Sequence, residues 1–141
     1  MPDVEVSIDI LAPPARVWEV LMDVDRWPEW TPTVTRVKRL DPAPLRFGSR
    51  AHIRQPNLLS AVWQVTQLDE EQGIFIWRSS SPGVVVAAGH HVEATATGSY
   101  ITLALVFSGF LGPLMAHLFR KMNQRYLTLE AQGLKARSEA P

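Results

Sequence analysis

Histidine is the side chain that titrates closest to neutral pH, and two of the four histidines in this sequence, His90 and His91, are adjacent. Both fall in a run typical of a β-strand, where neighbouring side chains point to opposite faces. His90 then shares the inward face with valines and an alanine, whereas His91 points to solvent. His90 is therefore the candidate general acid or base. The alternative is a buried structural histidine, since the pattern shows no carboxylate partner for it.

The same alternation argues against a metal site. The side chains of His90 and His91 diverge and cannot share one ion. The chain has no cysteine, and the other two histidines, His52 and His117, fall on polar faces of their elements. We predict no bound metal, and no sequence feature indicates a cofactor.

A few more side chains are predicted to face the interior together with His90. Because side chains alternate between the two faces of a strand, Gln55 is expected to point inward, as are Trp63 and Trp77 on the next two strands. A sparse polar set within an apolar lining is typical of a small-molecule site, although ordinary core packing is the alternative for each tryptophan and methionine. The candidate ligand-binding residues are Trp27, Trp30, Gln55, Trp63, Trp77, His90, Val92, Met115, Leu118 and Met122.

The elements that position these residues follow from hydrophobic spacing and turn residues. Val4–Leu11 alternates like a strand, a helix begins at Pro14, and a short second helix is expected around Trp27. Six further strands joined by short turns, the first at Asp41–Pro44, predict an antiparallel meander. They are expected at Val34–Leu40, Ser49–Gln55, Ala61–Leu68, Ile74–Ser80, Val84–Thr97 and Ser99–Phe107.

A long amphipathic helix is predicted after Gly112 and Pro113. Its buried stripe is expected to comprise Leu111, Met115, Leu118, Phe119, Met122, Tyr126 and Leu129. The polar residues after Gly133, about 134–141, are expected to fray. A curved seven-stranded antiparallel sheet wrapped around this helix is an α+β fold in the order strand, two helices, six strands, helix. Such an arrangement often leaves an apolar pocket between sheet and helix.

Composition narrows the class of protein. The chain has 141 residues, 46% of them hydrophobic, which fits a single domain over residues 1–141. Fourteen basic and fourteen acidic residues cancel, so nucleic acid is not an expected partner. The uncharged stretch between Glu93 and Arg120 is interrupted by glycine and proline, which argues against an integral membrane segment. The lack of cysteine and of a basic, apolar leader predicts a cytoplasmic protein.

Several pieces of sequence occur in an order typical of one known group. They are residues 12–21 (APPARVWEVL), 25–30 (DRWPEW), 47–50 (FGSR), 63–65 (WQV), 75–77 (FIW), the strand with His90, and 107–114 (FSGFLGPL). Together they resemble the START/polyketide cyclase-dehydrase (SRPBCC) superfamily, which has the helix-grip fold, and the resemblance covers nearly the whole chain. It implies a pocket for lipids, polyketides, isoprenoid quinones or other apolar molecules. It carries over no catalytic residue, because no local motif matches the acid/base set of an aromatic polyketide cyclase.

Three functional hypotheses remain open at this point. The first is binding, transport or sequestration of a small hydrophobic ligand such as a lipid, polyketide or isoprenoid. The second is an enzyme of the cyclase/dehydratase type in which His90 and Gln55 polarise a carbonyl or an enol. A buried carboxylate or tyrosine within reach of His90 would favour this enzyme. The third is a partner-binding module that forms a homodimer through the last helix or an edge strand.

Overall fold

The computed structural model describes residues 1–42 and 44–141, so Ala43 in the predicted turn at Asp41–Pro44 lies outside the described residues. The elements occur in the predicted order, and each strand begins and ends within two residues of its predicted bounds. They are β1 Val4–Ile10, α1 Pro14–Met22, the 3-10 helix η1 Val24–Glu29, β2 Arg36–Arg39, β3 Arg50–Arg54, β4 Ala61–Asp69, β5 Ile74–Ser81, β6 Val84–Thr95, β7 Gly98–Ser108, α2 Gly112–Leu118 and α3 Arg120–Glu139.

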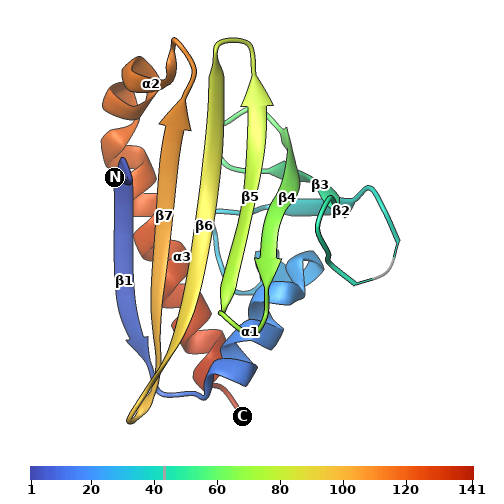
Figure 1. Cartoon of the computed structure of the whole chain (residues 1–141), viewed down its shortest axis with the longest axis vertical. Coiled ribbons are helices and arrows are strands. Elements are labelled where there is room, and N and C mark those ends of the chain that lie inside the picture. The colour runs from blue at the N-terminus through green and yellow to red at the C-terminus, as the bar shows by residue number, and fades with distance from the viewer. Residues whose placement is uncertain (43) are drawn as a thin grey trace.

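The seven strands form one antiparallel sheet in the order β1-β7-β6-β5-β4-β3-β2. Successive strands from β2 to β7 pair with each other as a meander, and β1 closes the far edge by pairing with β7. Figure 1 shows β2 and β3 running across the direction of the other strands, so the sheet is strongly bent, with α3 behind it. This is the predicted α+β helix-grip arrangement, with a curved sheet around a C-terminal helix.

Burial confirms the predicted alternation of side chains on the strands. In β3, Ala51 and Ile53 are buried while the residues between and beside them are exposed. In β5, Phe75 and Trp77 are buried. In β6, His90 is buried, whereas the side chain of His91 is 44% exposed and lies near Glu93. The strands therefore present one apolar face to the helices, as their period of two requires.

The predicted single C-terminal helix is instead kinked at Phe119 into α2 and α3. Backbone hydrogen bonds continue through the kink, from the N–H of Phe119 to the O of Met115 and from the N–H of Asn123 to the O of Phe119. The kink changes which side chains face the sheet, so the predicted stripe is wrong in part: Leu118 is 60% exposed. The buried positions of α3 are Asn123, Leu127, Ala131, Leu134 and Ser138.

The expected fraying after Gly133 is also wrong, because α3 continues to Glu139 and Leu134 is fully buried. Burial of a leucine side chain contributes about 1.5–3 kcal/mol, which is enough to hold a helix terminus in place. Gly133 does not end the helix. It lets α3 approach η1, since a Cβ at this position would lie 2.0 Å from the carbonyl O of Trp30.

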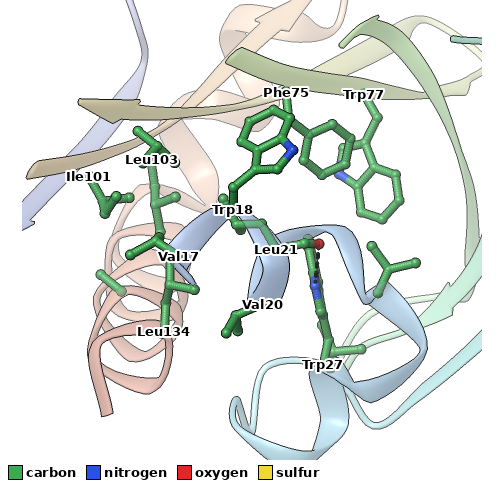
Figure 2. Packing of buried hydrophobic residues seen from close by; sticks show 14 of the residues in the cluster. Val17, Trp18, Val20, Leu21, Trp27, Phe75, Trp77, Ile101, Leu103 and Leu134 are labelled. Carbon is green, nitrogen blue, oxygen red and sulfur yellow. Dashed lines mark hydrogen bonds between the residues drawn. The ribbon is translucent and has the colours of Figure 1, made fainter. Parts of the chain in front are cut away.

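A hydrophobic cluster fills the space between α1, the end of α3 and the middle of β7. Figure 2 shows Val17, Leu21, Ile101, Leu103 and Leu134 meeting there. Because this part of the interior is filled by side chains, any space for a guest molecule must lie further along α3, toward its first turns.

Candidate functional site

A cavity of about 190 Å³ lies between the sheet and the first three turns of α3. A void needs only about 10–15 Å³ on the same measure to hold one water molecule, so this space is large enough for an organic molecule. Strands β3 to β7 supply one wall and α3 supplies the other. The lining comprises Trp27, Val34, Ile53, Gln55, Leu58, Trp63, Trp77, Val86, Ala88, Gly89, His90, Leu103, Ala104, Leu105, Phe107, Phe119, Met122, Asn123, Tyr126, Leu127 and Glu130.

The cavity has a mouth and a floor. Phe119, at the start of α3, lines it and is 39% exposed, whereas His90 and Trp27 line it and are almost fully buried. Lining residues on α3 extend from Phe119 to Glu130, about 16 Å along a helix that rises 1.5 Å per residue. The mouth therefore lies at the kink between α2 and α3, and the floor lies near His90.

His90 is held in place from three sides at this floor. Its ring stacks on Phe75, with centroids 4.7 Å apart and planes 13° apart, and Trp27 packs against it at 5.7 Å. Its Nδ1 lies 3.0 Å from the carbonyl O of Phe75. A carbonyl oxygen only accepts, so Nδ1 carries a proton and donates it to this bond. Nε2 is thereby directed away from the strand, toward α3.

Glu130 is the group that Nε2 of His90 faces. Its Oε1 lies 3.5 Å from Nε2, and the side chain is 13% exposed. An unprotonated Nε2 and a carboxylate oxygen are both acceptors, so the contact is favourable only when one proton lies on either of them. The separation exceeds an ordinary hydrogen bond, and Oε1 has no hydrogen-bond partner in the described part of the chain. Oε1 of Glu130 thus offers an open acceptor position beside the cavity.

Two amides add polar atoms to the lining. Asn123 on α3 is buried, and Gln55 follows β3. Neither side chain forms a hydrogen bond within residues 1–42 and 44–141, so both are available to a guest. Tyr126, by contrast, donates its hydroxyl to the carbonyl O of Pro56 at 2.6 Å and thereby ties α3 to the loop between β3 and β4.

Three tryptophans, whose ring planes are inclined to one another, form an aromatic wall. Trp27 and Trp77 have ring centroids 5.3 Å apart, and Trp63 and Trp77 have centroids 5.9 Å apart. The indole N–H of Trp27 is used internally, because it donates to the carbonyl O of Leu21 at 3.0 Å, the dashed line in Figure 2. Aromatic faces of this kind pack well against planar or ring-containing molecules.

Of the ten candidate residues from the sequence, the structure brings six to the cavity: Trp27, Gln55, Trp63, Trp77, His90 and Met122. The other four, Trp30, Val92, Met115 and Leu118, lie outside its lining.

Each exclusion has a physical reason. Trp30 packs behind Trp27 at 5.6 Å, and Val92 belongs to the filled part of the core. Met115 and Leu118 precede the kink at Phe119.

Sequence reasoning missed Asn123, Tyr126 and Glu130 as lining residues. Glu130 follows Leu127 by three residues and precedes Leu134 by four, so it shares a helical face with two leucines. A carboxylate on that face was the signal available in the sequence. Among the described residues, His90 and Glu130 have no third metal-ligating side chain beside them. No group of three or more such side chains that could hold a metal ion occurs in the part of the chain that the structure describes.

A bent sheet gripping a helix over a ligand-sized cavity defines a helix-grip domain. The sequence profile of the family described as polyketide cyclase / dehydrase and lipid transport matches residues 1–139. The chain belongs to this family.

Solved structures show the same fold at low sequence identity. A hypothetical protein from Helicobacter pylori is similar with a TM-score of 0.82 and 16% identity, over 96% of this chain and 87% of that one. The protein TTHA0849 from Thermus thermophilus gives a TM-score of 0.77 and 18% identity, over 96% and 95%. The Zhui aromatase/cyclase from Streptomyces sp. R1128 gives 0.72 and 19%, over 96% and 92%. No curated protein matches the chain.

Among the described residues, no helix combines the length and the hydropathy that a membrane-spanning helix requires.

Proposed function

We propose that this protein binds one small, mostly apolar molecule that also carries a polar group. The observation that carries the proposal is the cavity of about 190 Å³, whose lining is apolar except for a few side chains that include Gln55, His90, Asn123 and Glu130. Cavities with this balance bind apolar molecules by burial and orient them through a few hydrogen bonds.

The distribution of these groups defines how the ligand would lie. Its ring or chain would pack on the wall of Trp63 and Trp77. Its polar group would reach the floor, where Oε1 of Glu130 has an open acceptor position. A hydroxyl group is the best match, because it donates to a carboxylate oxygen and accepts from a protonated Nε2. A purely hydrocarbon ligand would leave these buried polar atoms without partners, which is costly.

The comparisons support the class of ligand. The family description includes both polyketide cyclases and lipid transport, and one similar structure is an aromatase/cyclase. For this chain we accordingly propose a lipid, a polyketide or an isoprenoid as the ligand.

Native mass spectrometry tests the proposal. The purified protein would be incubated with a total lipid extract, desalted and measured with its non-covalent contacts intact. We expect one additional mass that corresponds to a single retained molecule, which solvent denaturation releases. A protein that retains nothing from extracts of several sources would contradict the proposal.

Acid–base catalysis is a second candidate function, and the contact of His90 with Glu130 favours it specifically. The strand pattern alone indicated no partner for His90, whereas in the structure the largely buried carboxylate of Glu130 lies 3.5 Å from Nε2. A base of this kind needs a group that orients it, and here the carbonyl O of Phe75 and the ring stack orient His90. The pair could remove a proton from a carbon beside a carbonyl group and return it to an oxygen of the same ligand.

The two functions are separated by what happens to the bound molecule. For an enzyme, the ligand recovered after incubation differs from the ligand added, by mass or by absorbance. His90→Ala should then abolish this conversion and leave retention of the apolar ligand largely intact. Unchanged conversion in His90→Ala would remove His90 from the mechanism, and a ligand recovered unaltered from the native protein would favour binding alone.

A further inference from the structure

A row of exposed apolar side chains follows α2 to the mouth of the cavity. Phe110 is 84% exposed, Leu114 49% and Leu118 60%, and they recur every four residues. Leu114 and Leu118 lie on one side of α2, and Phe110 lies in the turn just before this helix. The row ends at Phe119, which both lines the cavity and is 39% exposed.

The loop between β3 and β4 supplies the opposite side of the mouth. Leu58 lines the cavity, and its neighbour Leu59 is 94% exposed. The hydrogen bond from Tyr126 to the carbonyl O of Pro56 holds this loop against α3. We name the exposed set the mouth patch: Leu59, Phe110, Leu114, Leu118 and Phe119. Figure 1 shows α2 at the end of the molecule where β5 and β7 finish.

The charged residues nearest to the mouth patch along the chain are basic. The sequence contains no acidic residue between Glu93 and Glu130, and the loop of residues 55–60 contains no charged residue. Arg120, Lys121 and Arg125 follow the patch directly on α3 and are exposed. No carboxylate among the described residues forms an ion pair with these three cations. Apolar side chains flanked by unpaired cations match a surface that is apolar inside and anionic outside.

We infer that the mouth patch docks on the surface of an anionic lipid bilayer. The exposed phenylalanines and leucines would enter the boundary between headgroups and acyl chains, while Arg120 and Lys121 would contact acidic headgroups. Docking in this orientation would open the cavity directly onto the lipid phase. An apolar ligand would then enter or leave without crossing water. Only the role of docking in ligand transfer rests on the proposed function, because docking itself needs no ligand.

The charges also favour a bilayer over a second copy of this chain. A twofold dimer through the mouth patch would bring Arg120 and Lys121 of both copies to one interface, where the patch itself has no carboxylate to pair with them. Like charges brought together across an interface oppose association, whereas an anionic surface is attracted to them.

Co-sedimentation with vesicles tests the inference on the whole chain without added ligand. We expect binding to vesicles of phosphatidylcholine with phosphatidylserine, and weaker binding to phosphatidylcholine alone. Phe110→Ser combined with Leu118→Ser should reduce partitioning at least about tenfold, because both side chains supply inserted apolar area. Lys121→Glu should weaken binding to the anionic vesicles only.

Phe47→Ser is the matched control. Phe47 is 74% exposed but lies between β2 and β3, at the sheet edge opposite to the strands that α2 contacts. It should bind vesicles like the unaltered chain. Equal loss in Phe47→Ser, or full binding by the double variant, would overturn the inference. The inference would also be overturned if sedimentation showed a dimer that Leu118→Ser dissociates and the chain did not bind vesicles. Retention of ligand by the double variant would show that ligand binding, the proposed function, does not depend on docking to the bilayer.

Discussion

Nε2 of His90 on β6 and Oε1 of Glu130 on α3 lie 3.5 Å apart at the floor of the cavity. The sheet contributes the nitrogen and the C-terminal helix contributes the oxygen, so their separation depends on how α3 is seated. The contact thus links the sheet to the C-terminal helix at the floor of the cavity. It also places the most polar part of the lining at the deepest point of an apolar space.

A double-mutant cycle measures this coupling. His90→Ala and Glu130→Ala each leave the other side chain buried without its partner. The double variant should therefore be less destabilised than the sum of the single variants, by about 0.5–3 kcal/mol in the free energy of unfolding. Chemical denaturation of the four proteins gives this value. Additive effects would show that the two side chains do not interact.

The sequence was sufficient for the strands and their faces. Alternation placed His90 inside and His91 outside, and it placed Phe75 and Trp77 on the buried face, because a period of two leaves no other assignment. The turns between the strands were equally clear from their glycines, prolines and acidic residues. Strand pairing between successive elements followed from the shortness of those turns.

The helical side of the site could not be predicted in the same way. A kink at Phe119 changes the direction of every later side chain, and no proline or glycine marks it. The predicted stripe therefore included the exposed Leu118 and missed Glu130. Contacts made by a helix depend on its rotation about its own axis, which hydrophobic periodicity defines only broadly.

Gly133 provides a second prediction, in which the usual effect of a helical alanine is reversed. Replacing glycine by alanine inside an exposed helix normally stabilises by about 1 kcal/mol. Here the added Cβ would lie 2.0 Å from the carbonyl O of Trp30, so η1 or α3 must shift. We expect Gly133→Ala to destabilise the fold by about 1–3 kcal/mol, a typical cost of overpacking.

The neighbouring exposed position supplies the control for that measurement. Gln132→Ala should be more stable than Gln132→Gly by the ordinary helical difference, measured by thermal or urea unfolding. If Gly133→Ala stabilised the protein as well, the close approach of α3 to Trp30 would be refuted.

Acid should loosen the end of α3. Hydrogen bonds from Lys135 and from the backbone N–H of Leu11 hold the pKa of Glu139 below its ordinary value of 4.5, and a hydrogen bond from Arg137 does the same for the pKa of Glu29. Below about pH 4.5 the unfolded chain thus binds more protons at these sites than the folded chain does. The contribution of these two carboxylates to the stability of the fold is present above this pH. It is lost as the pH falls through their lowered pKa values.

Amide hydrogen exchange between pH 6 and pH 3 would detect this effect, after correction for the intrinsic exchange rate, as declining protection over residues 134–139. Glu139→Gln combined with Glu29→Gln should show less of this pH dependence. Added salt should reduce it in the native chain too, because the carboxylates are partly exposed. Protection that stays constant over this range would contradict the assignment.

The central claim is that the space between sheet and α3 holds a guest, and filling that space tests it most directly. Ala88 lines the cavity beside Trp77, its paired neighbour on β5, whereas Ala87 pairs with Arg78 on the other face of the sheet. Native mass spectrometry would compare ligand retained by Ala88→Phe and by Ala87→Phe after identical incubation. We predict that Ala88→Phe loses the ligand and that Ala87→Phe keeps it. Equal retention by both variants would contradict the claim.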